Sequence, residues 1–377
     1  MFKKVNNSIF IILFLLTFFI PLLFTKWESG GVSETENRNL AKFPSLVSNG
    51  SFNLSFTTDF ETWFMDHMGF RQNLIDANKA FQKDVFDRAI SKSDYKTGKT
   101  GDSIYATNVI IKDYAHVNLR TEEDVARIGQ SYQEISDWLG AKGVPFYYVQ
   151  CVDKHTTYPE RFIASVKQIG AVSKTDQVID YLQDHTTVNT IYFKQLFADL
   201  RTQYDIFSHW GDPTHWTPRG AYMGYRHMME RINRDMEQPL IILDEEDYKI
   251  TLEVQEGPNG QSEQIEKFNI RDAKAQQVNV SAMGEWAEDH RHSIWKNPEA
   301  GNDKRLLLMA DSYFNSYLVD DIAESFGEVW LVWGEYTNDL PEIVELCKPD
   351  VVIYECAERV DRSESVCNLA ESLRNAD

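Results

Sequence analysis

The chain has 377 residues, of which 42% are hydrophobic and 25% charged, a balance typical of globular proteins and sufficient for one large or two modest domains. Its formal net charge of −20 would repel the phosphates of nucleic acids. Length, composition and charge therefore argue against a disordered chain and against a nucleic-acid partner.

The first segment, residues 1–27, has the pattern of a transmembrane helix. Two lysines precede an uncharged run from Asn6 to Thr25 that is dense in Ile, Leu and Phe, and another lysine follows it. Such a run matches a bilayer core of about 30 Å, and the leading lysines favour a cytoplasmic N-terminus. A secretory signal peptide is the alternative, although its apolar region usually has about 7–15 residues and ends at a small-x-small site. We expect an uncleaved anchor in the lipid bilayer of the cell, with the rest of the chain outside the cytoplasm.

Residues 28–120 are expected to form an extended arm and a helical segment that pack on the main domain. The stretch "ESGGVSETENRNLAKFPSL" is polar, and Phe60, Trp63 and Phe64 then recur at the spacing of one helix face. A later stretch, "GKTGDS", does not have the residue order of a phosphate-binding loop.

From residue 121 to residue 377, strand patterns alternate with helix patterns. "TEEDVARIGQSYQEISDWLGAKG" has a Thr cap, an acidic first turn and a glycine stop. "VPFYYVQCV", "RLLLMA", "EVWLVW" and "DVVIYECA" have the content of buried strands. This alternation predicts an α/β domain with a mainly parallel sheet and helices on both faces. Residues 238–302 are polar and irregular, and we interpret them as an insertion.

The four cysteines form no CxxC pair, which argues against a zinc ribbon and a redox dithiol. Two of them lie in apolar strand-like runs, where buried free thiols are expected. The disulfide status of the four stays open: Cys151, Cys347, Cys356 and Cys367.

A candidate nucleophile follows one of these strands. In "RLLLMADSYFNSYL", Asp311 and Ser312 lie between the strand and a helix, at the edge of the sheet where reactive residues gather. The free N–H groups at that helix N-terminus can stabilise an oxyanion. The alternative is that Asp311 or Ser312 only caps the helix.

A candidate base lies in "GDPTHWTPRGAY". A serine hydroxyl needs a neighbouring base to remove its proton, and His215 can be that base if a carboxylate fixes its tautomer. Asp212, three residues earlier on a turn stiffened by proline, is placed for that role. A structural histidine and a turn aspartate are the alternatives for each residue alone.

The two motifs together resemble those of SGNH hydrolases, which have an Asp-x-x-His block and a strand–(G/A)DS–helix block. The serine usually comes first in those chains, whereas here it comes last, and this order resembles the AlgX/AlgJ-like and DHHW proteins. Those proteins are polysaccharide O-acetyltransferases or their relatives. Ala310 departs from the glycine that is usual in the wider superfamily. Four further stretches resemble that family in the same order: "TENRNLAKFP" (35–44), "FETWFMDHMGFRQNLI" (60–75), "CVDKHTTYPERF" (151–162) and "KPDVVIYECAER" (348–359).

The resemblance implies an SGNH-hydrolase-like, flavodoxin-like fold with circularly permuted motif order. It also implies acetyl transfer to a polysaccharide acceptor at the cell surface or in secretion, without a cofactor. Because acetyl-CoA is not supplied outside the cell, a membrane-bound O-acyltransferase partner would deliver the acetyl group.

Other residues are weaker candidates. Asn315 and Asn338 are candidates for an oxyanion asparagine, while Lys154 and Tyr158 follow a strand end and are candidates for the substrate crevice. Trp216 can stack on a sugar or pack the turn, and packing is favoured. No metal is predicted, because the spacing of the remaining candidates matches no known ligand set: Asp66, His67, His290 and His292.

The sequence therefore predicts a membrane-anchored O-acetyltransferase in which Ser312 attacks the donor, His215 takes its proton and Asp212 holds the imidazole. Two alternatives stay open. One is a carbohydrate esterase with the same triad, and the other is a non-catalytic polysaccharide-binding or assembly protein.

Overall fold

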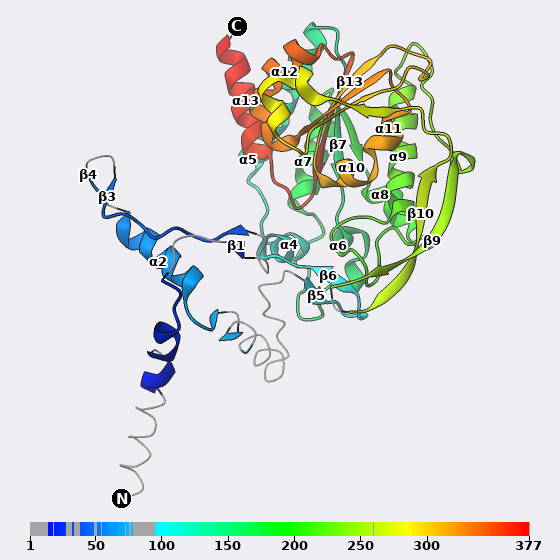
Figure 1. Ribbon diagram of the computed structural model, residues 1–377. Coiled ribbons are helices and arrows are strands. Elements are labelled where there is room, and N and C mark those ends of the chain that lie inside the picture. Colours follow the sequence, from blue (N-terminus) through cyan, green and yellow to red (C-terminus); the bar gives the residue numbers. More distant parts are fainter. Residues whose placement is uncertain are drawn as a thin grey trace, which may run out of the picture. The chain divides into compact units, whose positions relative to one another are not determined.

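The structure, a computed structural model, describes residues 14–17, 19–27, 32–33, 38–48, 51–53, 55–71, 73–74, 77, 95–258 and 260–376. The chain divides into two compact units, Met1–Lys92 and Ser93–Asp377 (Figure 1). The boundaries expected from the sequence, and the packing of residues 28–120 on the main domain, stay predictions.

The described residues of the first unit include helix α2, two small strand pairs and short helical stretches, among them residues 14–17 and 19–23. The aromatic spacing predicted a helix, and Trp63 lies in it, fully buried. Its ring contacts those of Phe43 and Phe60 at centroid distances of 4.8 and 5.6 Å. The elements are β1 (Val32–Ser33), β2 (Arg38–Asn39), β3 (Val47–Ser48), β4 (Ser51–Phe52) and α2 (Phe56–His67), with β1 antiparallel to β2 and β3 antiparallel to β4.

The predicted anchor is described only in part. Residues 14–17 and 19–23 are helical, whereas residues 1–13 and residue 18 lie outside the described residues. Within the described ranges, no helix combines the length and the apolar composition needed to cross a bilayer. The transmembrane helix therefore stays a prediction.

The second unit is built on a seven-stranded sheet in the order β11-β12-β14-β13-β15-β7-β8. The five strands from β14 to β8 are parallel, and β12 and β11 add to one edge in antiparallel pairing. The predicted α/β class with a mainly parallel sheet is confirmed. The strands are β7 (Phe146–Cys151), β8 (Asn189–Tyr192), β11 (Gln276–Val278), β12 (Ser293–Lys296), β13 (Arg305–Ala310), β14 (Glu328–Trp333) and β15 (Val351–Ala357).

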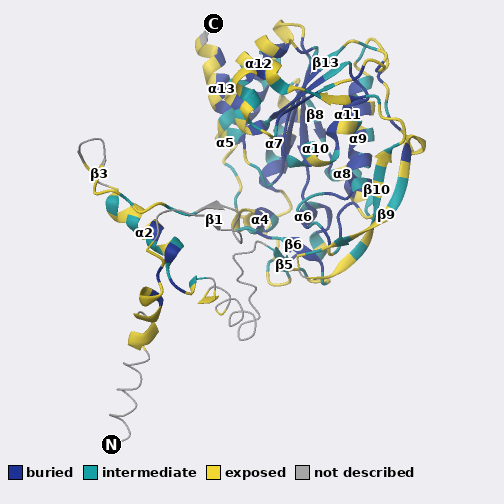
Figure 2. Ribbon diagram, viewed as in Figure 1, coloured by how far each residue is buried: buried dark blue, intermediate teal, exposed yellow. Residues whose placement is uncertain are grey.

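Helices cover both faces of this sheet, and buried residues concentrate between them (Figure 2). Side chains alternate along a strand, so Tyr147 packs with α8 to α11 on one face and Phe146 with α5, α7, α12 and α13 on the other. Each fully buried apolar side chain contributes about 1.5–3 kcal/mol. The helices are α4 (Asn108–Tyr114), α5 (Glu122–Ala141), α6 (Lys154–Thr157), α7 (Lys174–His185), α8 (Lys194–Leu200), α9 (Pro218–Asn233), α10 (Ser312–Tyr317), α11 (Val319–Ala323), α12 (Leu340–Cys347) and α13 (Ser363–Ala376).

Helix starts follow the local sequence. The Thr121 hydroxyl accepts a hydrogen bond from Asp124 N at the start of α5, as the sequence predicts. Thr217 caps α9 in the same way, with Pro218 at its first position. The helix expected after β13 is broken at Leu318 into α10 and α11.

The stretch interpreted as an insertion has two different parts. Strands β11 and β12 join the main sheet, whereas β9 (Tyr248–Glu256) and β10 (Ser262–Ile270) form a separate antiparallel hairpin. A small hairpin of β5 (Tyr95–Thr97) and β6 (Ser103–Tyr105) and four 3-10 segments complete the unit. The 3-10 segments are η1 (Pro159–Arg161), η2 (Glu245–Asp247), η3 (Val280–Glu288) and η4 (Gly334–Asp339).

Candidate active site

Ser312 is the first residue of α10 and follows directly from β13. The preceding residue, Asp311, is buried and caps the helix by accepting a hydrogen bond from Tyr313 N at 3.0 Å. Asp311 is also tied to β15, since its N–H donates to Glu355 Oε2 at 2.8 Å and its Oδ2 accepts from Ala357 N at 3.0 Å. These bonds fix the turn that presents Ser312.

Asp212, His215 and Ser312 form a continuous hydrogen-bonded row. His215 Nδ1 lies 2.8 Å from Asp212 Oδ2, and His215 Nε2 lies 2.8 Å from Ser312 Oγ, across 97 residues of sequence. With a carboxylate at Nδ1, that nitrogen carries the proton, and the serine hydroxyl donates to Nε2. The side chains of His215 and Asp212 are 18% and 25% exposed, so the row is open to solvent at one side.

Two residues that the sequence did not suggest hold the Asp212 carboxylate. Thr214 donates to Oδ1 from its hydroxyl and, at 2.7 Å, from its N–H, and Tyr317 OH donates to Oδ2 at 3.3 Å. Burial alone would raise the pKa of Asp212, but the hydrogen bond and charge of His215 and the bonds from Thr214 outweigh it and hold that pKa below its usual range. The carboxylate therefore stays ionised opposite the imidazole.

The Ser312 N–H is available to a ligand. In the described part of the chain it has no hydrogen-bond acceptor, while the next three N–H groups of α10 are directed at Asp311. Asn315 is half-buried on α10, and Asn338 is exposed in η4. Neither amide hydrogen-bonds to a described side chain, so their assignment as oxyanion residues stays a prediction.

Lys154 lies beneath the loop that leads to Asp212. Its ammonium donates to Ser208 O at 2.6 Å and to Ser103 O at 2.9 Å, and it lies 3.6 Å from the Asp102 carboxylate. Burial lowers the pKa of Lys154 to about 8, although Asp102 opposes the shift. Lys154 therefore supports the loop that leads to Asp212 through these hydrogen bonds.

Tyr158 and Trp216 are also buried. Tyr158 OH accepts from Ile206 N at 3.2 Å, and Arg161 covers its ring at 3.8 Å. Trp216 is 1% exposed and packs against Tyr313 at a centroid distance of 5.0 Å, which agrees with a packing role.

The hairpin β9–β10 supports the loop that carries Asp212. The Glu263 carboxylate accepts from the three successive N–H groups of residues 209–211 at 2.9, 2.9 and 2.6 Å. Gln255 Oε1 accepts from Asp212 N at 3.2 Å, and a Cβ at Gly211 would lie 2.0 Å from that oxygen. The region predicted as an insertion therefore positions the candidate acid–base pair, a role that its polar, irregular sequence does not indicate.

Arg359 joins the two halves of the site. Its guanidinium donates to Thr214 O at 2.9 Å, to Tyr313 OH at 3.2 Å and to the Asp153 carboxylate. It therefore contacts the residue before His215 and the residue after Ser312.

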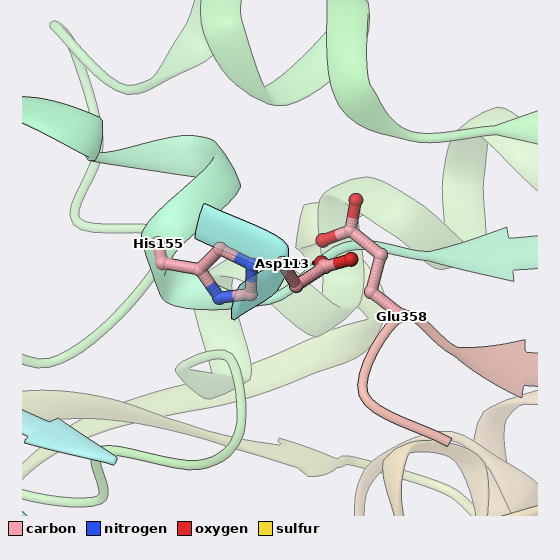
Figure 3. Close-up of side chains that lie close together, drawn as sticks. All are labelled: Asp113, His155 and Glu358. Carbon is pink, nitrogen blue, oxygen red and sulfur yellow. Dashed lines mark hydrogen bonds and ion pairs between the residues drawn. The ribbon is translucent and has the colours of Figure 1, made fainter. Parts of the chain in front are cut away.

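A buried group with the chemistry of metal ligands lies nearby (Figure 3). Asp113, His155 and Glu358 each offer one ligand atom, all within 4.8 Å of one another. His155 Nε2 lies 3.2 Å from Asp113 Oδ2, and Glu358 Oε2 accepts from Asp153 N and Thr156 Oγ1 at 2.9 and 2.7 Å. Burial raises the pKa of Glu358 to about 7, against the lowering effect of His155. Among the described residues this is the only such group, and it contains none of the four residues considered from the sequence.

The fold is an α/β domain with a mainly parallel central sheet, which is consistent with an SGNH-hydrolase-like domain. Residues 113–289 match the family model described as "SGNH hydrolase-like domain, acetyltransferase AlgX". The predicted resemblance to the AlgX/AlgJ-like group is thereby confirmed. The matched range contains Asp212 and His215 and ends before Ser312.

A comparison with solved structures finds matches of low sequence identity. Bacillus cereus PatB1 is 15% identical with a TM-score of 0.50, over 64% of this chain and 90% of that chain. A DHHW family protein from Eubacterium siraeum DSM 15702 is 16% identical over 71% of this chain and 92% of that one, with a TM-score of 0.47. The O-acetyltransferase domain of Pseudomonas putida AlgJ is 12% identical over 74% of this chain and 99% of that chain, with a TM-score of 0.48. A search of curated proteins gives no significant match.

Proposed function

We propose that the protein is an O-acetyltransferase that moves an acetyl group onto a polysaccharide through a Ser312–His215–Asp212 triad. The observation that carries this proposal is the unbroken row of two 2.8 Å contacts that ends at a serine on a helix N-terminus. The match to a family model named for the acetyltransferase AlgX supports the choice of acyl group.

In the first half-reaction, Ser312 Oγ attacks the carbonyl carbon of an acetyl ester, and its proton passes to His215 Nε2. The Ser312 N–H, which has no acceptor in the described structure, donates to the oxyanion that forms. When the intermediate collapses, the donor oxygen leaves with the proton from His215, and an acetyl-serine remains.

In the second half-reaction, an acceptor hydroxyl attacks the acetyl-serine and gives its proton to His215. Collapse of the second intermediate transfers the acetyl group and returns the proton to Ser312 Oγ. Asp212 stays ionised throughout and stabilises the imidazolium of both steps, consistent with the lowered pKa of its carboxyl group.

We further propose that the chain is anchored by residues 1–27 in the cell membrane, with a cytoplasmic N-terminus, and acts outside the cytoplasm. The apolar run between flanking lysines supports the anchor. An extracytoplasmic enzyme needs an exported donor, so a membrane-bound O-acyltransferase is the partner that the family resemblance suggests.

The test is hydrolysis of a small acetyl ester by the full chain and by Ser312→Ala, with acetyl-enzyme detected by mass spectrometry. Ser312→Ala is expected to lose the acetyl adduct and at least about 10³-fold in turnover, since removal of a nucleophile leaves only the residual effect of the site. Ser372→Ala, an exposed serine on α13, is the matched control. Undiminished turnover by Ser312→Ala would overturn the assignment, and acetate release without any transfer to saccharide would identify an esterase instead.

A further inference from the structure

An open hollow of about 570 Å³ lies beside α10, between α10–α11 and strand β10 of the hairpin. Ser316 and Tyr317 line it from α10. Residues four apart share one face of a helix, so Ser316 lies on the side of α10 that carries Ser312, one turn away. Tyr317 also connects the hollow to the proposed triad, because its hydroxyl donates to Asp212 at 3.3 Å. The hollow therefore adjoins the proposed triad.

The lining combines aromatic rings with polar groups. Trp295 of β12 is partly buried, and its orientation is fixed by a 3.0 Å hydrogen bond from its indole N–H to Ser293 Oγ. Asn269 of β10 is exposed and adds an amide. Aromatic faces pack on the C–H surface of sugars, while amides, hydroxyls and carboxylates bond to their hydroxyl groups. The hollow thus has the chemistry of a saccharide site.

The charge of the lining is unbalanced. Its described residues include four with carboxyl groups and one lysine: Glu253, Asp320, Asp321, Glu324 and Lys267. Burial raises the pKa of Asp321 to about 7, and the buried carboxylate of Glu324 accepts from two backbone N–H groups. The lysine is neutralised on its own hairpin, where its Nζ lies 3.0 Å from the carboxylate of Glu253. The Asp320 side chain is exposed and hydrogen-bonds to no other described residue, so its charge is available to a ligand.

We propose that this hollow binds the acceptor chain of the transfer reaction, and that it selects neutral or amine-bearing saccharides over uronate polymers. The inference rests on the proposed acetyl transfer at Ser312. An acceptor seated here would bring a hydroxyl toward the acetyl-serine along one face of α10. The exposed carboxylate of Asp320 at its wall repels carboxylated sugars and attracts ammonium groups.

The experiment compares three oligosaccharides of equal length: N-acetylglucosamine, its de-N-acetylated form, and galacturonate. Binding is measured by calorimetry, and acetyl transfer from a small acetyl ester by mass spectrometry. The full chain is expected to favour the first two over galacturonate by about tenfold or more, as a like-charge contact of about 1.4 kcal/mol would give. Asp320→Lys is expected to remove or invert that preference.

Glu371→Lys is the matched control, because it makes the same charge change at an exposed position of α13, which packs on the other face of the sheet. Trp295→Leu keeps an apolar side chain in β12 and is expected to weaken binding of all three saccharides. Hydrolysis of the small ester should be the same in wild type and Glu371→Lys.

Three results would overturn the inference while leaving ester hydrolysis at Ser312 intact. They are a wild-type preference for galacturonate, no binding of any of the three saccharides, and a charge preference or saccharide affinity that neither Asp320→Lys nor Trp295→Leu changes. Ester hydrolysis that persists in Ser312→Ala would overturn the proposed function instead.

Discussion

The serine and the acid–base pair of the proposed triad are held by two different kinds of structure. The turn at Ser312 is fixed from within the sheet, where buried Asp311 is bonded to Glu355 and Ala357 of β15. The loop with Asp212 and His215 is fixed from outside the sheet, by side chains of the β9–β10 hairpin. Changes near the serine should therefore affect the stability of the whole domain, whereas changes in the hairpin should mainly affect activity.

The largest effect is expected from Asp311→Ala. It leaves the buried N–H groups of Tyr313 and Ala357 without their acceptors, at a cost of about 1–3 kcal/mol each. The melting temperature should fall by roughly 5–15 °C for a domain of this size. Asp311→Asn keeps one carbonyl acceptor and should lose less stability. An unchanged melting temperature in the alanine variant would show that the turn at Ser312 does not contribute to the stability of the domain.

Asp321 connects the two regions, since it lies on α11 and accepts from Tyr248 OH of β9 at 2.8 Å. Burial raises the pKa of Asp321 to about 7, although the bond from Tyr248 opposes the shift. The folded protein therefore binds a proton that the unfolded chain has lost, and this contribution to stability is full below the usual Asp pKa and is lost as the pH rises to about 7.

Asp321→Asn should accordingly flatten the profile of stability against pH. The difference between variant and wild type should grow by on the order of 2–4 kcal/mol from pH 4 to pH 8, in favour of the variant. Chemical denaturation at several pH values measures it. Parallel profiles for the two proteins would show that Asp321 titrates normally.

A smaller effect, on activity alone, is expected from Glu263→Gln. The carboxylate accepts three N–H groups of the loop, and a neutral amide holds them less strongly. We expect kcat for a small acetyl ester to fall about tenfold, with KM and the melting temperature nearly unchanged, as a misplaced base costs about 1.4 kcal/mol.

Glu256→Gln, an exposed glutamate at the end of β9, is the control for that variant. A fall in melting temperature that accompanies the loss of activity would contradict the proposal that the hairpin mainly affects activity, because the hairpin would then also stabilise the core.

The smallest effect should come from Thr214→Val, which removes the hydroxyl that donates to Asp212 and keeps the N–H. Loss of one hydrogen bond of about 0.5–1.5 kcal/mol should lower kcat roughly threefold to tenfold. Thr214→Ser keeps the hydroxyl and should retain most of the activity. Equal activity of the valine and serine variants would show that the Thr214 hydroxyl does not contribute to the reaction.

Much of the fold follows from local sequence signals. The cap at Thr121, the apolar run of β13 and the alternation of strands and helices from residue 121 are each set by nearby residues, so these elements were predictable. Asp212 and His215 could be paired because they share one turn. Their approach to Ser312 rested on the rule that strand ends of a parallel sheet share one edge.

The rest depends on contacts between distant residues. Glu263 lies in a polar stretch with no strong pattern, and its bonds reach residues more than fifty positions away. Lys154 follows a strand end as a crevice residue would, but three backbone carbonyls enclose its ammonium. The break at Leu318 separates two helices that share one apolar pattern. Such outcomes are decided by tertiary packing and not by spacing.

The position of β15 in the sheet has a consequence for biosynthesis. This strand is the last of the sheet in sequence, yet it pairs with β13 on one side and β7 on the other. Until it is made, the half-sheet followed by Ser312 and the half-sheet followed by Asp212 and His215 share no strand. A nascent chain therefore carries Ser312 and His215 on separate half-sheets, and the proposed triad can assemble only after β15 has joined them.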